Sequence, residues 1–257
     1  MIPVLFEWGP LKIHSFGFML AVTFLLMAAL ATREFRRRGY TADAAGSVVL
    51  GAMLGGVLGA KVYYLIDNWS STMADPVGMV FSGAGLTFYG GLVGGTLGVL
   101  LAGRRHKVPL FHLLDLTAPL LALGYATGRI GCFLNGDDYG RVSDAPWAMA
   151  FPEGTPPTTL RVHPTQIYEV AASLLIFLVL WMSRRRWERR PGRVMGIYGI
   201  LGGLERFAVE FYRTNEPVAA GLTLAQWTSF GVILIGIGLL AASASRVAAG
   251  VRDSRAA

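Results

Sequence analysis

LLALGYATGRIGCFLNGDDYGR, residues 120–141, joins an apolar run directly to a polar motif. The run ends near Gly128, and the residues after it include two arginines, two aspartates and an asparagine. An apolar run of this kind is typical of a helix that crosses a membrane, where about 20 residues span roughly 30 Å of hydrocarbon. Polar residues gathered at the end of such a helix predict a site at the membrane surface.

The composition of the whole chain agrees with this interpretation. Of its 257 residues, 53% are hydrophobic and 15% are charged, and the mean hydropathy is +0.50. An average soluble domain has roughly 25% charged residues. We therefore predict an all-α polytopic membrane protein. The N-terminus lacks the basic start, short apolar core and cleavage site of a signal peptide, so we expect it to be retained.

The net charge of +7 does not require a nucleic-acid partner, because most of the basic residues lie in short clusters beside apolar segments. The clusters are Arg33, Arg36, Arg37 and Arg38; Arg104, Arg105 and Lys107; Arg184, Arg185, Arg186, Arg189, Arg190 and Arg193; and Arg246, Arg252 and Arg255. Basic residues are enriched in the short cytoplasmic loops of membrane proteins. All four clusters are therefore expected on the cytoplasmic side.

About seven transmembrane helices satisfy this distribution. The expected spans are residues 14–32, 45–66, 84–103, 109–128, 165–183, 194–213 and 223–244. The N-terminus is then outside and the C-terminus cytoplasmic, with one transmembrane domain over residues 1–257. Residues 67–83, 129–164 and 214–221 are expected on the outer side, and the segment 129–164 carries the motif.

Two glycine-rich segments, GAMLGGVLGA (51–60) and GLTFYGGLVGGTLG (85–98), place small residues at helical spacing. Such spacing favours close packing of helices in a membrane. Tyr89 lies among these glycines in the outer part of the expected third span, where its phenol needs a partner or a ligand.

Charged residues within the expected spans are few. A central arginine costs roughly 2.5 to 3.5 kcal/mol on insertion scales, so each one indicates function. Arg129 closes the fourth span, while Arg206, Glu210 and Arg213 have i, i+4, i+7 spacing and are expected on one face of the sixth. An alternative is structural: Arg206 pairs with Glu210, and Arg213 reaches the interface.

Arginines from two helices at one depth predict a site for a buried anion, since a guanidinium binds phosphate bidentately. At this depth a lipid headgroup is the expected source of the phosphate. Glycines 128, 131, 136 and 140 could also bring backbone N–H groups to the anion. Glycine spacing alone is a weak signal.

The segment RVHPTQIYEV, residues 161–170, follows a proline-rich stretch and opens the fifth span. His163 could be a structural residue or a base, and Gln166 and Glu169 could face inward or pair across helices. Cys132 is the only cysteine, so no internal disulfide and no cysteine-rich metal site is possible. Zinc-site, P-loop and serine-hydrolase motifs are absent from the sequence.

The chain resembles the bacterial prolipoprotein diacylglyceryl transferases over nearly its whole length. The motifs that carry the resemblance are HSFGFML (14–20), LTFYGGLVGG (86–95), GRIGCFLNGDDYGR (128–141), HPTQIYE (163–169), GRVMGIYGILGGLERFAVEFYR (192–213) and LAQW (224–227). The stretch 128–141 matches the family signature, which is highly specific.

The resemblance implies transfer of the diacylglyceryl group of phosphatidylglycerol to the lipobox cysteine of a prolipoprotein signal peptide. This first step of lipoprotein maturation forms a thioether, releases glycerol 1-phosphate and needs no cofactor or metal. It implies a multi-pass protein of the bacterial inner membrane, surrounded by membrane lipids, with its active site towards the outer face.

The site residues follow from the matched motifs. Arg129 and Arg206 are expected to stabilise the departing phosphate, and Glu210 to orient Arg206. The residues expected at the substrate are Phe16, Gly90, Gly91, Asn135, Asp137, Asp138, Gly140, Arg141, His163, Gln166 and Arg213.

The sequence departs from the common family pattern at Tyr89, Phe16, Cys132 and Asp137, where many members have histidine, tyrosine, asparagine and glutamate. A histidine base is therefore not assured, and Tyr89 and His163 are the candidates for the base. Two other functions stay open: a carrier of anionic lipid, and an inactive paralogue that binds lipoprotein precursors.

Overall fold

The computed structural model describes residues 2–8, 11–82 and 87–256, and most of these are helical. The elements in chain order are β1 (Val4–Trp8), β2 (Leu11–His14), α1 (Ser15–Arg37), α2 (Ala42–Asp67), α3 (Trp69–Ala74), α4 (Pro76–Phe81), α5 (Phe88–Arg105), α6 (Leu110–Asn135), β3 (Met149–Phe151), β4 (Thr158–Val162), α7 (Thr165–Trp187), α8 (Arg193–Glu210), β5 (Pro217–Ala219), β6 (Leu222–Thr223) and α9 (Leu224–Ala256). They form two compact units. The first unit holds residues 1–26 and 114–257, and the second unit holds residues 27–113.

Five described helices are long and apolar enough to cross a membrane: Ser15–Arg37, Ala42–Asp67, Leu110–Asn135, Thr165–Trp187 and Leu224–Ser245. They lie at the expected first, second, fourth, fifth and seventh spans. The shorter α5 and α8 lie at the third and sixth, and the expected start of the third span at residues 84–86 falls outside the described residues. A helical, multi-pass membrane protein fits these helices, and the number of seven spans stays a prediction.

Several helices extend beyond the expected spans. Arg33, Arg36 and Arg37 of the first basic cluster lie in the last turns of α1, and Arg184, Arg185 and Arg186 lie in the last turn of α7. Cations are favoured there because the C-terminal end of a helix carries partial negative charge. The helix α9 continues to Ala256, and the side chains of the fourth basic cluster lie outside the described residues.

In the second unit, α2 and α5 pack against each other through glycines. A Cβ atom at Gly98 would meet the backbone of Gly51, and one at Gly94 would meet that of Gly55. A Cβ at Gly90 would likewise meet Gly59. Because the partners run in opposite directions along the two helices, α2 and α5 are antiparallel. This contact confirms that the glycine-rich segments serve close helix packing.

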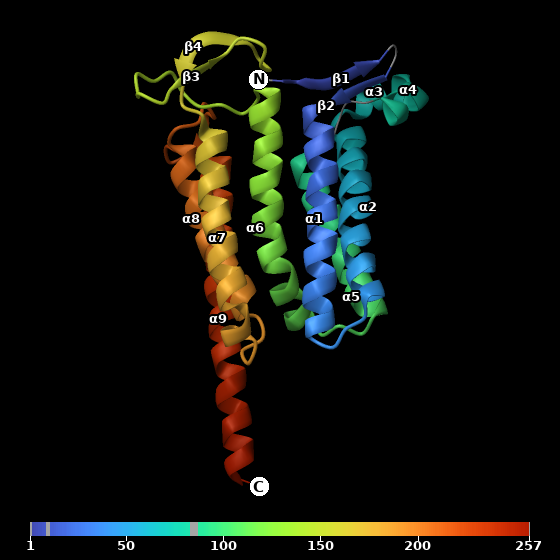
Figure 1. Cartoon of the computed structure of the whole chain (residues 1–257), viewed down its shortest axis with the longest axis vertical. Coiled ribbons are helices and arrows are strands. Elements are labelled where there is room, and N and C mark those ends of the chain that lie inside the picture. Colours follow the sequence, from blue (N-terminus) through green and yellow to red (C-terminus); the bar gives the residue numbers. More distant parts are fainter. Residues whose placement is uncertain (1, 9–10, 83–86, 257) are drawn as a thin grey trace. The chain divides into compact units, whose positions relative to one another are not determined.

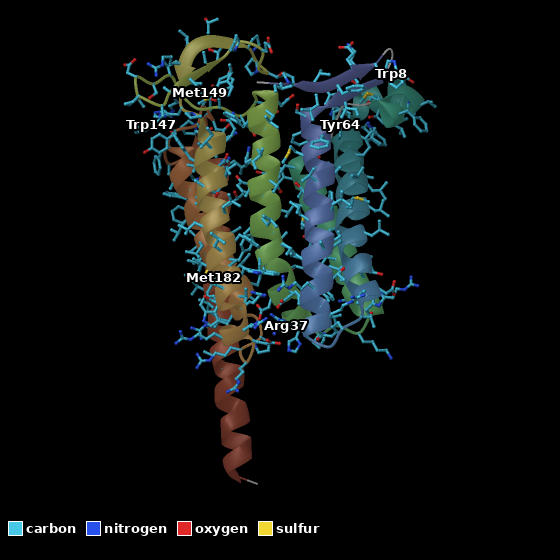
Figure 2. All side chains as sticks on the ribbon, in the orientation of Figure 1. Trp8, Arg37, Tyr64, Trp147, Met149 and Met182 are labelled. Atoms are coloured by element: carbon cyan, nitrogen blue, oxygen red, sulfur yellow. The ribbon has the colours of Figure 1, made fainter. Side chains whose placement is uncertain are left out.

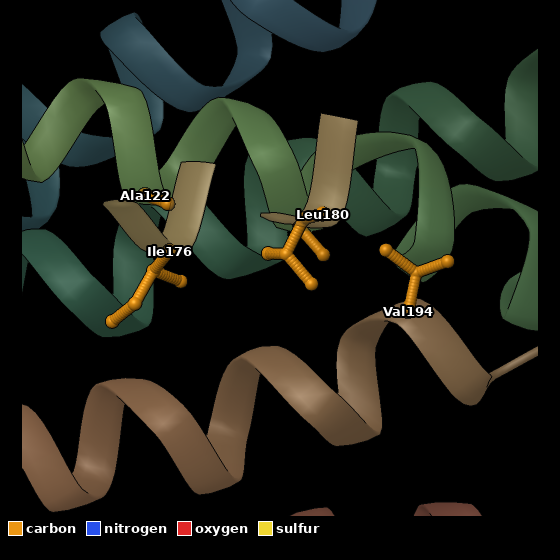
Figure 3. Close-up of a cluster of buried hydrophobic side chains, with 5 residues drawn as sticks. Ala122, Ile176, Leu180 and Val194 are labelled. Atoms are coloured by element: carbon orange, nitrogen blue, oxygen red, sulfur yellow. The ribbon is translucent and has the colours of Figure 1, made fainter. Parts of the chain in front are cut away.

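The core of the first unit lies between α6, α7 and α8. Figure 3 shows Ala122 of α6 beside Ile176 and Leu180 of α7, with Val194 at the start of α8. All are buried. The apolar packing places α7 and α8 side by side, as Figure 1 shows, and this alignment brings their polar residues together near one end.

The other end of α8 is fixed by a buried carboxylate. Asp115 of α6 accepts hydrogen bonds from the backbone N–H groups of Gly192 at 2.8 Å and Met195 at 3.0 Å. The first N–H groups of a helix lack partners within the helix and carry partial positive charge, so a carboxylate stabilises this terminus. Asp115 therefore sets the position of α8 along α6.

The expectation of an all-α fold was incomplete, because the described residues also form three antiparallel strand pairs: β1 with β2 before α1, β3 with β4 between α6 and α7, and β5 with β6 between α8 and α9. The last hairpin turns at Ala220 and Gly221, with φ of 49° and 74°. Two successive residues with positive φ match the twist of a tight hairpin. Each strand has at most five residues, and the helical class of the fold holds.

The hairpin β3–β4 lies at the end of the first unit where α6 ends and α7 begins (Figure 1). Trp147 and Met149 lie at this end, and Met182 lies towards the other (Figure 2). The basic last turn of α7 is also at the other end. The polar motif and the third basic cluster thus occupy opposite ends of the first unit.

Candidate active site

The polar motif starts inside α6. The segment 129–164 was expected to be external, and its first residues, up to Asn135, belong to α6. It ends at Gly136, whose φ is 73°, and the N–H groups of Gly136 and Asp137 donate to the carbonyl of Cys132. This is a Schellman-type helix end, which requires a left-handed residue at the position of Gly136. The helix therefore carries Arg129 and Cys132 on its last turns.

The same geometry shows that the idea of glycine N–H groups binding an anion was wrong. Gly128 and Gly131 are inside α6, where N–H groups donate to helical carbonyls. The N–H of Gly136 donates to Cys132, and that of Gly140 donates to His163 at 2.8 Å. These four N–H groups are therefore not available as donors to an anion.

Glu169 of α7 is the centre of the site. Its side chain is 0% exposed, and it faces residues of α6 and α8. Its Oε2 atom lies 3.1 Å from Arg129 Nε, and its Oε1 atom lies 3.2 Å from Arg206 Nη1. The hydroxyl of Tyr125 donates to Oε1 at 2.6 Å. One carboxylate thus holds two arginines from different helices close together, as the sequence predicted for that pair.

Arg206 also pairs within its own helix. Its Nη2 atom lies 2.9 Å from Oε2 of Glu210, as the i, i+4 spacing predicted. The other oxygen of Glu210 accepts hydrogen bonds from Asn215 and Thr223 at 2.7 and 2.8 Å. Glu210 is therefore fixed by the segment that follows α8, and it fixes Arg206 in turn.

Arg213 lies beyond the end of α8 at Glu210, so the prediction that it belongs to the helix was wrong. The chain leaves the helix through a turn in which the N–H of Arg213 donates to the carbonyl of Glu210 at 3.1 Å. The guanidinium still turns towards the cluster, with Nη1 3.8 Å from Glu169 Oε2. Its Nε atom is buried and has no hydrogen-bond partner within the described parts of the chain.

Asp138 connects two of the arginines. Its Oδ2 atom lies 2.6 Å from Arg129 Nη1, and its Oδ1 atom lies 2.6 Å from Arg213 Nη2. Burial raises the pKa of this carboxyl, but the guanidiniums of Arg213 and Arg129 lower it by more, so its pKa lies below the ordinary value. We call these residues the arginine cluster: Arg129, Arg206, Arg213, Asp138, Glu169 and Glu210.

Asn135, Asp137 and Gln166 lie next to the cluster and support the loop after α6. Asn135 Nδ2 donates to Asp137 Oδ2 at 2.6 Å, and Gln166 Nε2 donates to the carbonyl of Asp137 at 2.5 Å. Thr165 donates to the carbonyl of Asp138 at 2.8 Å. The first turn of α7 therefore holds the backbone that presents Asp138.

Gly140, Arg141 and His163 tie the same loop to the segment after α8. The N–H of Arg141 donates to the carbonyl of Tyr212 at 2.8 Å, and Arg141 Nε donates to the carbonyl of Arg213 at 2.8 Å. A Cβ at Gly140 would lie 2.8 Å from Thr165 Cγ2. The space at Gly140 is thus filled by packing, and these residues position Arg213.

An aromatic cavity of about 320 Å³ lies beside His163, lined also by Trp147, Tyr168 and Tyr212. The hydroxyl of Tyr168 accepts from Trp147 Nε1 at 2.6 Å and lies 3.0 Å from His163 Nδ1. One ring nitrogen of His163 is therefore engaged in a hydrogen bond.

Phe16 of α1 packs on α6, because a Cβ at Gly131 would lie 3.2 Å from Phe16 Cδ2. Tyr89 belongs to the second unit, in the first turn of α5, and is 41% exposed. Gly90 and Gly91, expected at the substrate, lie on the side of α5 that faces α2. For these two glycines the structure supports a packing role.

Cys132, Asp137 and Asp138 place possible metal-ligand atoms within 4.8 Å of one another. Both oxygens of Asp138 already accept from guanidiniums, and two cations beside the group would repel a metal ion. The set therefore does not have the character of a metal site.

Three residues of the site were missing from the predicted set. Glu169 was not in that set, although it was expected to face inward or to pair across helices, and it does pair with Arg129 of α6 and Arg206 of α8. Tyr125 lies one turn before Arg129 in α6, and its hydroxyl accepts from Arg129 Nη2 at 3.2 Å. Glu205 accepts from Ser173 of α7 at 2.6 Å. Helical spacing would have located Tyr125 from Arg129 and Glu169 from Gln166, but not Glu205, which is the chain neighbour of Arg206.

Comparison with known proteins adds a family. Residues 3–242 match the family described as Prolipoprotein diacylglyceryl transferase. The chain is similar to a protein of Pseudomonas aeruginosa, with 37% identity over 252 residues that cover 93% of this chain and 92% of the relative. It is also similar to a protein of Clostridium tetani, with 35% identity over 240 residues, 92% of this chain and 96% of the relative. Both relatives are named phosphatidylglycerol–prolipoprotein diacylglyceryl transferase.

Proposed function

Because the chain belongs to the prolipoprotein diacylglyceryl transferase family, we propose that it transfers the diacylglyceryl group of phosphatidylglycerol to a prolipoprotein. The acceptor is the thiol of the lipobox cysteine in the signal peptide. A carbon–sulfur bond forms, the bond between that carbon and the phosphate oxygen breaks, and glycerol 1-phosphate leaves. The observation that supports this function most directly is the group of three arginines around Glu169.

The arginine cluster suits the departing phosphate. The phosphodiester carries one negative charge, and the phosphate gains charge as the carbon–oxygen bond breaks. Donors aimed at that charge bind the transition state more strongly than the ground state, which accelerates the reaction. Arg129 is our candidate for the main contact, because it approaches from α6 and one of its partners is the half-exposed Asp138.

Arg206 has a supporting part in this proposal. It contacts Glu169 and Glu210, both 0% exposed, so its guanidinium has a fixed orientation. An arginine held in this way needs little rearrangement during the reaction, which is the advantage of a preorganised site. Glu210 and Glu169 are thus positioning residues.

The thiol must lose its proton, since the thiolate is the nucleophile. Tyr89 and His163 are the two candidates for the base. His163 has one ring nitrogen hydrogen-bonded to Tyr168, and in the tautomer in which that nitrogen is the donor, the other nitrogen can accept a proton. Turnover of Tyr89→Phe and His163→Asn across pH distinguishes them, because only loss of the base removes the rise in rate with pH.

We further propose that the protein lies in the bacterial inner membrane, with seven spans, the N-terminus outside and the C-terminus cytoplasmic. The polar motif and the basic last turn of α7 lie at opposite ends of the first unit (Figure 1). The positive-inside rule puts the basic end in the cytoplasm, and hence the arginine cluster towards the outer face. Exported precursors would meet the site there.

The test is an assay with purified protein, phosphatidylglycerol and a peptide with one lipobox cysteine, in which thioether and glycerol phosphate are both measured. Arg129→Ala is expected to lower kcat by roughly 100- to 1,000-fold, the usual effect of removing one transition-state donor. Arg185→Ala, an exposed change at the basic end of α7, is the matched control. Full turnover by Arg129→Ala would exclude a role for Arg129 in stabilising the departing phosphate. Absence of both products with the wild type would exclude the proposed transferase activity.

A further inference from the structure

The carboxylate of Asp138 lies where a bound anion would be expected. Its two oxygens each contact a terminal guanidinium nitrogen at 2.6 Å, one from Arg129 and one from Arg213. Two oxygens of one phosphate would make the same pair of contacts, because guanidinium groups bind carboxylate and phosphate in similar geometry. A phosphate that used both arginines in this way would have to replace Asp138.

Asp138 differs from the other carboxylates of the cluster in its exposure. Its side chain is 43% exposed, while those of Glu169 and Glu210 are 0% exposed. It also lies on a loop, with a left-handed φ of 61°, whereas the two glutamates lie on helices. It is thus the carboxylate of the cluster that a ligand can reach.

The backbone of Asp138 is held in place independently of its carboxylate. Its carbonyl accepts from Thr165 at 2.8 Å and from Arg213 Nη1 at 3.1 Å. The carboxylate could therefore leave the arginines by rotation of the side chain, while the loop keeps its position.

The charges of the cluster favour such an exchange. With all side chains ionised, the three arginines are balanced by Glu169, Glu210 and Asp138. A phosphodiester would add an unbalanced negative charge to this neutral group. Without the Asp138 carboxylate, the group has one positive charge in excess, which matches one phosphodiester.

We infer that Asp138 is a displaceable internal anion, which occupies the arginines Arg129 and Arg213 until the phosphate of a lipid headgroup replaces it. The inference rests on the proposed function, since it names the competitor of that substrate. Asp138 is in this view a residue that sets affinity and does not react.

Exchange of the Asp138 carboxylate with phosphate would also assist product release. The product phosphate carries more charge than the substrate phosphodiester, so the arginines bind it more tightly. The return of the Asp138 carboxylate competes for the same guanidiniums and helps the product to leave. Removing the carboxylate should therefore tighten both substrate binding and product inhibition.

The experiment measures the KM for phosphatidylglycerol and the inhibition constant of glycerol 1-phosphate in the transfer assay. For Asp138→Asn both constants are expected to fall roughly two- to fivefold, the range of a partly exposed ion pair. Asp144→Asn is the matched control, because it removes the same charge from an exposed residue of the same segment. Its constants should stay within error of the wild type.

A purely structural role for Asp138 predicts the opposite result. Loss of the bridge would then disorder Arg129 and Arg213 and raise both constants. Unchanged or higher constants in a folded Asp138→Asn protein would overturn the inference, and Asp138→Ser repeats the test if the asparagine variant does not fold. If the wild type shows no turnover, the proposed function fails. Direct binding of phosphatidylglycerol in mixed micelles then decides: tighter binding by the variant supports displacement, and equal or weaker binding refutes it.

Discussion

Asp138 lies on the loop after α6, outside the expected membrane-spanning helices. The pH dependence of protein stability can therefore report on its ionisation. Its pKa is lowered by Arg213 and Arg129 against the effect of burial. A carboxyl with a lowered pKa in the folded state stabilises the fold above its unfolded pKa of about 3.9. That stabilisation is lost as the pH falls through the folded value.

We therefore expect the difference in thermal midpoint between wild type and Asp138→Asn to depend on pH. At pH 7 the wild type should unfold at the higher temperature, because only its residue 138 is charged. Below about pH 4 the difference should shrink, since a protonated aspartate and an asparagine are both neutral. Thermal unfolding of both proteins in one detergent between pH 7 and pH 3 provides the measurement. A difference that is constant over this range would show that shape, and not charge, sets the effect.

The arginine cluster was predictable in part from single residues. Arg129, Arg206 and Glu210 could be identified because a charge in an apolar segment is costly and needs a reason. The bridge from Asp138 to Arg213 could not, because it depends on a left-handed turn at residue 138 and on a turn after α8. Neither turn has a glycine or proline at the residue concerned, which are the usual signals of such a bend.

At the scale of the element, α6 shows that an apolar span and the helix that contains it end at different residues. The predicted span ended at residue 128, just before the charged residue Arg129. The helix in fact ends at Gly136, which can adopt the left-handed conformation that the helix end needs. The first charged residue, Arg129, indicates the edge of the apolar region, while Gly136 indicates the end of the helix. These two positions are about two helical turns apart.

The packing of α2 on α5 leads to a prediction of its own. In Gly94→Ala the new methyl group would lie 2.8 Å from Gly59 Cα and closer still to the carbonyl of Gly55, so the helices must separate. Overpacking of this kind costs about 1 to 3 kcal/mol. The thermal midpoint of the purified protein should therefore fall. Gly46→Ala in α2 is the control, because no atom lies within 4 Å of its new methyl group. Helix propensity alone would raise the midpoint in both variants, because alanine favours a helix more than glycine does. A Gly94→Ala midpoint that is not lower than that of Gly46→Ala would therefore contradict the packing role.

At the scale of the whole molecule, the sequence predicted the class of protein well and its details less well. Apolar segments and basic clusters identify a multi-pass helical protein from composition alone, since hydrocarbon excludes charge and unpaired backbone groups. Hairpins such as β3–β4 depend on short local pairings within polar segments, which hydropathy does not describe. The role of Tyr89, in the second unit, stays a prediction, because the sequence of one segment does not specify its contacts with a distant segment.

The orientation of the protein can be tested with the single native cysteine removed. In a Cys132→Ser background, one new cysteine is placed at Asp144, between α6 and α7, and in a second variant at Arg189, after α7. A thiol reagent that cannot cross the membrane should label Asp144→Cys in intact spheroplasts, because the motif end is expected outside. Arg189→Cys should react after the membrane is opened, since basic residues stay on the cytoplasmic side. The reverse pattern would place the arginine cluster towards the cytoplasm, where it could not meet exported precursors, and the proposed route of the peptide substrate would have to be given up even if transfer occurs in detergent.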